Sequence, residues 1–293
     1  MIRNRPCQDG ANGLIGLVTT PIGNRDDITL RALNFLKEAD IIACEDTRNT
    51  GLLLSGYQIK PKRLVSLYAQ TELKDAKKLV EEVRQKHLKL AYCSDAGMPG
   101  ISDPGSLLVK TAYESGVAVT IFPGPTASLS ALVISGIDSA DFSFYGFLPT
   151  KKGSQELLLE ELKNRKETLI FYESPKRLTK TLSVMTKIFG NERKVSVIRE
   201  LTKAHEEVVS GTFSELISSP IEERGECVII VEGFKGTETI DWDAIRNELS
   251  DRLKYGETLS DLSKQLSLSY HVSKKEVYSL GLELKQNNTG KQK

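Results

Sequence analysis

The first 122 residues alternate between short apolar runs and segments whose apolar residues recur at helical spacing. The apolar runs predict strands at residues 14–19, 41–44, 64–67, 88–93 and 117–122. The amphipathic segments predict helices at residues 29–38, 47–54 and 72–86. This alternation is typical of an α/β domain, which we place at residues 14–122, after a loose N-terminal extension over residues 1–13.

The alternation resumes after a Pro/Gly-rich break at residues 122–125, which we interpret as the joint between two domains. Further strands are predicted at residues 142–147, 167–172, 194–199 and 227–231, with helices between them. Residues 207–211 predict an additional antiparallel strand. The second domain is placed at residues 123–234. Repeated strand–helix alternation predicts mainly parallel sheets with helices on both faces.

The alternation of strands and helices ends after residue 234, and we expect a small helical module at residues 235–293. Its helices are predicted at residues 242–253, 258–266 and 273–283, with Ser260 and Ser273 as N-caps and a turn over residues 265–269. This order resembles a helix-turn-helix. Ten basic and nine acidic residues nearly balance in the module, so DNA binding is not required. A packing or dimer-stabilising role is the alternative.

The most informative stretch is Ser-Asp-Ala-Gly-Met-Pro-Gly-Ile-Ser-Asp-Pro-Gly, at residues 94–105. It follows a predicted strand and precedes a helix that we expect to begin with Asp103 as N-cap and Pro104 at its first position. Its three glycines allow the backbone to approach a ligand closely. Open α/β sheets bind ligands beyond the carboxyl ends of their strands. The density of Gly and Pro favours a ligand-binding loop over an ordinary strand-to-helix turn.

Other polar clusters also follow predicted strands. They lie at residues 19–24, 43–48, 122–128, 171–177, 199–206 and 225–227. Because the carboxyl ends of parallel strands meet at one edge of a sheet, we expect these clusters to converge on one ligand site.

The composition is that of a globular protein, with 39% hydrophobic and 27% charged residues. No apolar run approaches the roughly 20 residues that a membrane-spanning helix needs, and the polar N-terminus lacks the apolar core of a signal peptide. Cys7, Cys44, Cys93 and Cys227 form no C-x-x-C pair, and the last three lie in predicted strands. We therefore expect buried thiols and a reducing, cytoplasmic environment.

The net charge of +1 excludes a uniformly basic nucleic-acid-binding chain. Residues 151–205 nevertheless hold 13 Lys and Arg against 7 Asp and Glu. This local surplus suits a polyanionic substrate. Solvated helix faces are the alternative explanation, with equal weight.

Seven short motifs occur in a fixed order. They are Thr-Pro-Ile-Gly-Asn (20–24), Asp-Ile-Thr-Leu-Arg-Ala-Leu (27–33), Glu-Asp-Thr-Arg (45–48), the loop at 94–105, Pro-Gly-Pro-Thr-Ala (123–127), Phe-Tyr-Glu-Ser-Pro-Lys-Arg (171–177) and Arg-Glu-Leu-Thr-Lys (199–203). Together they resemble the ribosomal RNA small subunit methyltransferase I family. Its members are bacterial 16S rRNA cytidine 2′-O-methyltransferases of the tetrapyrrole methylase superfamily. The resemblance extends over roughly residues 14–233.

The resemblance implies two α/β domains of the tetrapyrrole methylase type, S-adenosylmethionine in the cleft between them, and a homodimer. The cofactor-binding residues that it implies are Pro21, Asp95, Ala96, Gly97, Met98, Pro99, Gly100, Ile101, Pro123, Gly124, Thr126 and Ala127. The implied substrate is a cytidine ribose in the decoding region of 16S rRNA, within the 30S subunit. We assign no metal ligand, no DNA partner and no membrane partner.

Methyl transfer from a sulfonium to a hydroxyl is an in-line displacement, which depends on alignment and on a group that favours ionisation of the hydroxyl. The candidate catalytic residues are Glu45, Asp46, Arg48 and Glu173. The candidate substrate-binding residues are Asn24, Lys176, Arg177, Arg199 and Glu200. For each carboxylate, a helix N-cap or an ion pair with a nearby arginine is the alternative role.

Two other functions stay open. One is a small-molecule methyltransferase of the same superfamily that acts on a tetrapyrrole-like ring, which predicts activity without RNA. The other is a non-catalytic ribosome-assembly protein, which predicts RNA binding that does not depend on the cofactor. The Glu-Asp-Thr-Arg motif argues against the first and the intact glycine-rich loop against the second.

Overall fold

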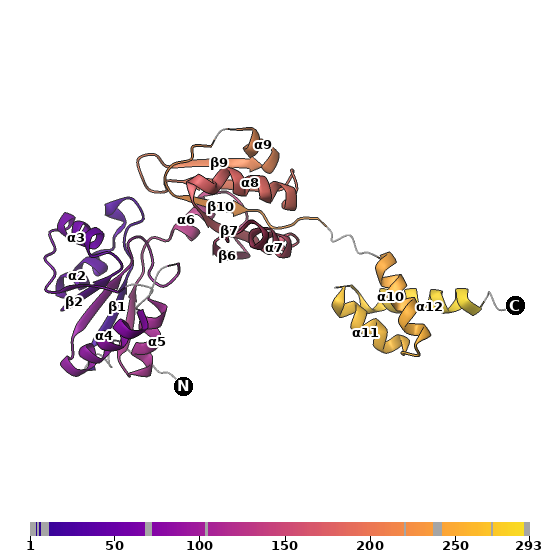
Figure 1. Ribbon diagram of the computed structural model, residues 1–293, viewed down its shortest axis with the longest axis horizontal. Coiled ribbons are helices and arrows are strands. Elements are labelled where there is room, and N and C mark those ends of the chain that lie inside the picture. Colours follow the sequence, from indigo (N-terminus) through magenta and orange to yellow (C-terminus); the bar gives the residue numbers. More distant parts are fainter. Residues whose placement is uncertain are drawn as a thin grey trace. The chain divides into compact units, whose positions relative to one another are not determined.

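The computed structural model describes two compact units, Met1–Phe234 and Lys235–Lys293 (Figure 1). The residues that it describes are 4, 6, 12–67, 72–102, 105–219, 221–236, 242–270 and 272–289. The first unit contains two five-stranded sheets, and the second contains helices. In the described part of the chain, no helix has both the length and the apolar character needed to cross a membrane.

The first sheet is entirely parallel, with strand order β3-β2-β4-β1-β5. Its strands are β1 (Leu14–Val18), β2 (Ile41–Cys44), β3 (Leu64–Ser66), β4 (Lys89–Cys93) and β5 (Ala118–Phe122). Its connections contain η2 (Arg25–Asp27), α2 (Leu30–Glu38), α3 (Thr47–Gly56), α4 (Glu72–Lys86) and α5 (Ser106–Glu114). The predicted parallel sheet is confirmed here, and β1 lies in register between β4 and β5.

Helices cover both faces of this sheet. One apolar core joins strand residues such as Ile15 and Tyr92 to Leu79 of α4 and Leu108 of α5. The other core lies on the opposite face, where α2 and α3 pack, and it includes Phe35. Burial on both faces explains why these strands read as continuous apolar runs.

The second sheet has the order β6-β7-β10-β8-β9. Its strands are β6 (Phe142–Phe147), β7 (Thr168–Glu173), β8 (Lys194–Arg199), β9 (Glu207–Thr212) and β10 (Cys227–Val231). Its helices are α6 (Ala127–Ile134), α7 (Lys152–Leu162), α8 (Pro175–Phe189) and α9 (Phe213–Ser218).

The expectation of a mainly parallel sheet is wrong for this second sheet. Only β6 and β7 pair in parallel, whereas β10 is antiparallel to both β7 and β8, and β9 is antiparallel to β8. The reason is that the chain reverses direction at the predicted antiparallel strand β9. The crossover through α9 then inserts β10 between β7 and β8, in the direction of β9.

The two faces of the second sheet are covered unequally. Residues of α7, α8 and α9, including Leu159, Met185 and Leu216, pack on one face. On the other face a smaller core joins Ile170 and Val228 to Ala131 and Leu132 of α6. One short helix cannot cover a five-stranded sheet, so part of this second face is left to line a cavity.

Several predicted boundaries need correction. Helix α5 begins at Ser106, with Gly105 at the N-cap position, and Asp103 and Pro104 lie outside the described residues. Cys7 lies outside them as well. Asn4, in the predicted N-terminal extension, donates from its side-chain amide to the Val119 carbonyl (2.6 Å) and accepts from the Val119 N–H (3.1 Å). These two bonds fix Asn4 against strand β5.

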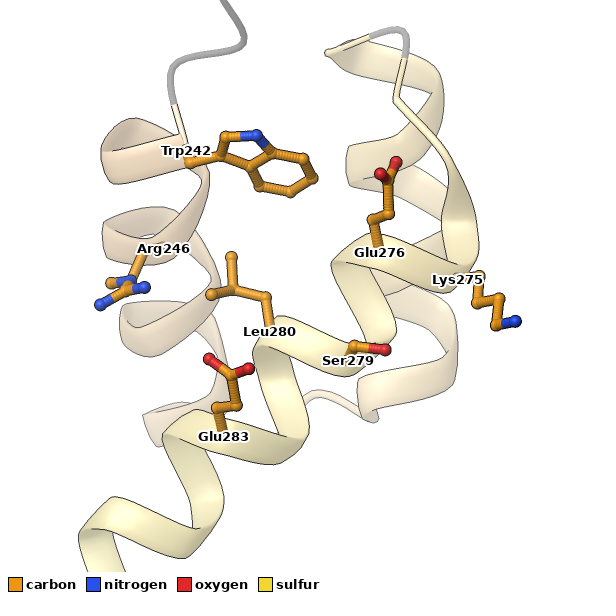
Figure 2. Close-up of a pocket in the computed structure, with 7 residues that line it drawn as sticks. All are labelled: Trp242, Arg246, Lys275, Glu276, Ser279, Leu280 and Glu283. Atoms are coloured by element: carbon orange, nitrogen blue, oxygen red, sulfur yellow. The ribbon is translucent and has the colours of Figure 1, made fainter.

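The second unit contains α10 (Trp242–Lys254), α11 (Leu259–Ser269) and α12 (Lys274–Thr289) around a small apolar core. The N-cap of α11 is Thr258 and not Ser260, because its side chain accepts from the Asp261 N–H (3.2 Å). The turn predicted at residues 265–269 is wrong, because buried Leu266 continues the helical spacing. A groove of about 510 Å³ lies between α10 and α12, and Figure 2 shows Trp242 and Leu280 directed toward it.

Arg193 joins several segments at one end of the second sheet. Its buried guanidinium donates to the carbonyls of Glu232 (2.6 Å), Lys163 (2.6 Å) and Arg165 (3.4 Å). The guanidinium also lies over the ring of Phe189, 4.7 Å from the ring centroid. Only a planar guanidinium presents several donors in this fixed arrangement.

We predict that Arg193→Lys lowers the free energy of unfolding by about 2–4 kcal/mol, because buried carbonyls lose a charged donor. The matched substitution Arg165→Lys, at an exposed side chain, changes it by less than about 0.5 kcal/mol. Urea denaturation followed by circular dichroism measures both. Equal stability of the two variants would contradict this role of Arg193.

Candidate functional site

The loops that follow β1 and β4 are joined by a backbone bridge. The Thr20 N–H donates to the Gly97 carbonyl (3.0 Å), and the Gly97 N–H donates to the Thr20 carbonyl (3.1 Å). The Thr19 N–H donates to the carbonyl of Phe122, at the end of β5 (3.2 Å). Gly97 has a φ of +78°, which side-chain-bearing residues rarely adopt. The predicted ligand loop is therefore fixed to the loop after β1, which is itself bonded to the end of β5.

A cavity of about 720 Å³ opens between this loop and the face of the second sheet that α6 covers only in part. From the first sheet and its junction with α6, the lining includes Ile22, Asp95, Ala96, Gly97, Met98, Ile101, Ser102, Thr126, Ala127, Ser128 and Leu129. From the second sheet and its loops, it includes Phe142, Phe144, Phe147, Tyr172, Glu173, Ser174, Pro175, Ile198, Leu201, Gly225, Glu226, Cys227 and Val228.

The structure brings seven of the predicted cofactor-binding residues to this cavity. They are Asp95, Ala96, Gly97, Met98, Ile101, Thr126 and Ala127. Five others are not among the lining residues: Pro21, Pro99, Gly100, Pro123 and Gly124. Pro21 and Pro99 are buried within the loops after β1 and β4. An added Cβ at Gly124 would lie 3.1 Å from the Thr19 side chain, so Gly124 packs against the end of β1.

Asp95 connects the glycine-rich loop to the start of α3. Its carboxylate accepts from the Asn49 side-chain amide (2.8 Å) and from the Asp46 N–H (3.3 Å). Asp46 is the N-cap of α3, since its side chain accepts from the Arg48 N–H (2.8 Å). The Arg48 side chain is 90% exposed, with its Nε 3.6 Å from Asp46. Glu45 is half-buried. These three candidates lie near the loop but outside the cavity lining.

Glu173 lines the cavity, yet its buried carboxylate already has three partners. It accepts from the Ser174 N–H (2.7 Å) and the Thr181 hydroxyl (2.6 Å), and Arg177 Nε lies 3.4 Å away. Arg177 donates in turn to the carbonyls of Leu148 and Pro149 (both 3.1 Å). The carboxylate therefore holds the start of α8 and, through Arg177, the loop that follows β6.

Arg199 and Glu200 take part in ion pairs within the second sheet. The buried Arg199 lies 2.9 Å from Glu207 and 3.1 Å from Glu222, and the hydrogen bond that it donates to the Glu207 carboxylate raises the pKa of this guanidinium. Lys203 donates to Glu200 (2.8 Å) and holds the pKa of that carboxyl below its usual range. Neither Arg199 nor Glu200 reaches the cavity lining.

The β8–β9 loop also contacts the loop after β1. The Asn24 N–H donates to the Thr202 hydroxyl (3.0 Å). Glu200 and Thr202 have φ values of 51° and 66°, an uncommon conformation for residues with side chains. Lys176, in the first turn of α8, is exposed to solvent. Of the predicted substrate-binding residues, Asn24 thus joins the two sheets, and Lys176 presents a cation to solvent.

The apolar wall of the cavity was not predicted from the sequence. Its aromatic members are Phe142, Phe144, Phe147 and Tyr172. A usable signal was present, because Phe142 and Phe144 alternate along one predicted strand and therefore share a face.

The described cysteines confirm the expectation of buried thiols. Cys44, Cys93 and Cys227 are buried and free, and burial raises the pKa of each. Cys227 lines the cavity, and its pKa is raised to about 11. Within the described residues, no three His, Cys, Asp or Glu side chains lie together as a metal ion would require.

Comparison with known proteins places this geometry among methyltransferases. Residues 15–217 match the family model of the Tetrapyrrole (Corrin/Porphyrin) Methylases. The chain is 40% identical to the Ribosomal RNA small subunit methyltransferase I of Bacillus subtilis over 288 residues, which cover 95% of this chain and 98% of that protein. It is 42% identical to the protein of the same name from Halalkalibacterium halodurans over 275 residues, which cover 92% and 94%.

The solved structure of the methyltransferase CobJ has the same fold. It matches with a TM-score of 0.56 at 19% identity, over 75% of this chain and 94% of CobJ. The expected α/β fold of the tetrapyrrole methylase type is confirmed by this match and by the family model.

We predict that Cys227 resists alkylation in the folded protein. A pKa of about 11 leaves about one thiol in a thousand ionised at pH 8, and only the thiolate reacts. The alkylation rate is expected to rise about tenfold per pH unit between pH 8 and 10. Iodoacetamide labelling mapped by mass spectrometry measures it, with the urea-unfolded chain as reference. Equal rates at pH 8 in folded and unfolded chain would contradict the assignment.

Proposed function

The chain belongs to the ribosomal RNA small subunit methyltransferase I family, and on that premise we propose that it methylates the 2′-oxygen of a cytidine ribose in the decoding region of 16S rRNA, within the 30S subunit. S-adenosylmethionine is the proposed methyl donor. The observation that carries the proposal is the cavity that the glycine-rich loop shares with the second sheet. The near full-length identity to rRNA methyltransferases supports the choice of substrate class.

The residues of the cavity fit the proposed cofactor. Apolar side chains such as Ile22, Leu201 and Val228 suit an adenine ring, and residues 95–98 of the glycine-rich loop line the same cavity. The carboxylate of Asp95 suits ribose hydroxyls or an ammonium group. When bound, the cofactor would supply an electrophilic methyl group. Pro21, Pro99, Gly100, Pro123 and Gly124 would support the loop from beneath.

The chain's own residues would supply alignment and a proton acceptor. The Thr20–Gly97 bridge fixes the loop, which favours a single orientation of the ligands and so lowers the barrier to in-line transfer. Glu45 and Asp46 are the proposed proton acceptors, because they lie beside Asp95 at the edge of the sheet. Glu173 has three internal partners, so we assign it a positioning role at the start of α8.

Exposed cations beside the site would bind the RNA backbone. Arg48 extends into solvent from the start of α3, and Lys176 does so from the start of α8. Guanidinium and ammonium groups bind phosphates favourably. Arg177, Arg199 and Glu200 are committed to internal bonds and would shape this surface indirectly, while Asn24 would fix the loop after β1.

We also propose that the protein forms a homodimer and lies in the cytoplasm. Helix α6 exposes Leu129 (46%) and Val133 (77%), which lie one turn apart and offer an apolar face to a second copy. The three buried, free thiols suit a reducing compartment.

The proposed function is tested by methyl transfer from radiolabelled S-adenosylmethionine to 30S subunits that lack rRNA modifications, with the product mapped. Label on the 2′-oxygen of one decoding-region cytidine is the expected result. Cofactor binding without RNA labelling would direct attention to tetrapyrrole-like acceptors. RNA binding without cofactor binding would favour a non-catalytic assembly protein.

We predict that two variants separate the cofactor site from the RNA site. Asp95→Ala is expected to weaken S-adenosylmethionine binding by about 10-fold or more, since a charged hydrogen-bonding group is lost. Arg48→Ala is expected to leave that affinity unchanged and to lower kcat/KM for 30S subunits by about 10-fold.

Isothermal titration calorimetry and the methyl-transfer assay measure these two effects. Arg84→Ala, at an exposed residue of α4, is the matched control and should change neither. Unchanged cofactor affinity in Asp95→Ala would refute the assignment of the cavity, and full activity of Arg48→Ala would refute the phosphate contact.

A further inference from the structure

Three phenylalanines of strand β6 share the face that lines the cavity. Phe142 and Phe147 are 43% and 60% exposed, which is unusual for large apolar side chains. Tyr172 of β7 packs edge-on against Phe144 (4.8 Å between ring centroids) and against Phe147 (5.5 Å). Together Phe142, Phe144, Phe147 and Tyr172 form an aromatic shelf at the edge of the second sheet.

A β-bulge brings Phe147 to this shelf. Phe144 pairs with Ile170 and Phe147 pairs with Tyr172. Two residues of β6, Tyr145 and Gly146, therefore lie opposite the single residue Phe171 of β7. Tyr145 points to the other face, where it stacks on Phe171 at 5.5 Å. Gly146 takes a φ of +63° at the bulge. Strict alternation would place Phe147 on the buried side with Tyr145, so the extra residue turns an apolar ring toward the cavity instead.

Lysines follow the aromatic shelf closely in the sequence. Lys151 and Lys152 follow Phe147 by four and five residues at the start of α7, and the Lys152 side chain is 79% exposed. The Arg177 guanidinium fixes the intervening loop through the Leu148 and Pro149 carbonyls, and Glu173 anchors Arg177. Exposed Lys176 directly precedes Arg177 in helix α8. The backbone that carries Lys151 and Lys152 is thus fixed to the start of α8, which carries Lys176.

We propose that this aromatic shelf is a stacking platform for an unpaired RNA base, with Lys151, Lys152 and Lys176 at the adjoining phosphates. The assignment rests on the proposed function and names the part of the site that takes the nucleic acid. Unpaired bases stack on aromatic side chains, and cations nearby neutralise the backbone. The shelf faces the same cavity as the glycine-rich loop, so a base stacked there places its own or a neighbouring ribose beside the methyl donor.

The positive charge of the lysines near the shelf favours RNA over an apolar small molecule as the ligand. A purely apolar ligand would gain nothing from the exposed lysines that follow the shelf. Single-stranded RNA uses both features, because each nucleotide presents a flat base and an anionic phosphate.

The test compares Phe147→Ala with Phe147→Trp and with Leu157→Ala, a control at an exposed apolar residue of α7. Three quantities are measured for each: the Kd for unmodified 30S subunits by filter binding, the KM and kcat of methyl transfer, and the Kd for S-adenosylmethionine by calorimetry. Phe147→Ala is expected to raise the Kd and KM for 30S subunits about 10-fold with cofactor affinity unchanged. Phe147→Trp restores both values, and Leu157→Ala leaves them unchanged.

Three results would overturn the proposal. They are unchanged 30S binding by a folded Phe147→Ala variant, a loss of cofactor affinity in that variant, and equal losses in Leu157→Ala. Circular dichroism establishes that each variant folds. If the wild-type protein binds 30S subunits without methylating them, the proposed function fails, while the binding comparison still decides the role of the shelf. If it does not bind them, both fail.

Discussion

The backbone bridge between Thr20 and Gly97 is the interaction on which the arrangement of the site depends. Parallel strands β4, β1 and β5 end at the same edge, and the bridge fixes the loops after β1 and β4 to each other there. Asp95 extends this connection to α3 through Asn49 and the Asp46 N–H. A loop that would otherwise sample many conformations is thereby held in one, which reduces the entropy lost when a ligand binds.

The second sheet supplies what the first sheet lacks. Three of its helices cover one face, while α6 covers only part of the other, so an apolar surface faces the cavity. The bulge in β6 enlarges that surface with Phe147, and Glu173 and Arg177 fix the loop that leads to Lys151 and Lys152. Cofactor and nucleic acid would then meet at one cavity, because polar loop and aromatic wall come from different sheets.

The strands of the first sheet were predictable because burial on both faces leaves continuous apolar runs in the sequence. The glycine-rich loop was predictable from the density of Gly and Pro after such a run. The direction of β10 was not, since its five buried residues read the same in either orientation. The commitment of Glu173 to Ser174, Thr181 and Arg177 was not predictable either, because only the folded chain brings these groups around one carboxylate. The face on which Phe147 lies was not predictable, because it depends on the bulge in β6, which strand periodicity does not reveal.

The central claim is that the cavity between the glycine-rich loop and the second sheet binds the methyl donor. A crystal structure with S-adenosylhomocysteine, the demethylated product, tests it most directly. Ligand density is expected in the cavity, against Asp95, Gly97 and Thr126. Density elsewhere, for example in the groove beside Trp242, or a fully occupied ligand that contacts none of these residues, would contradict it.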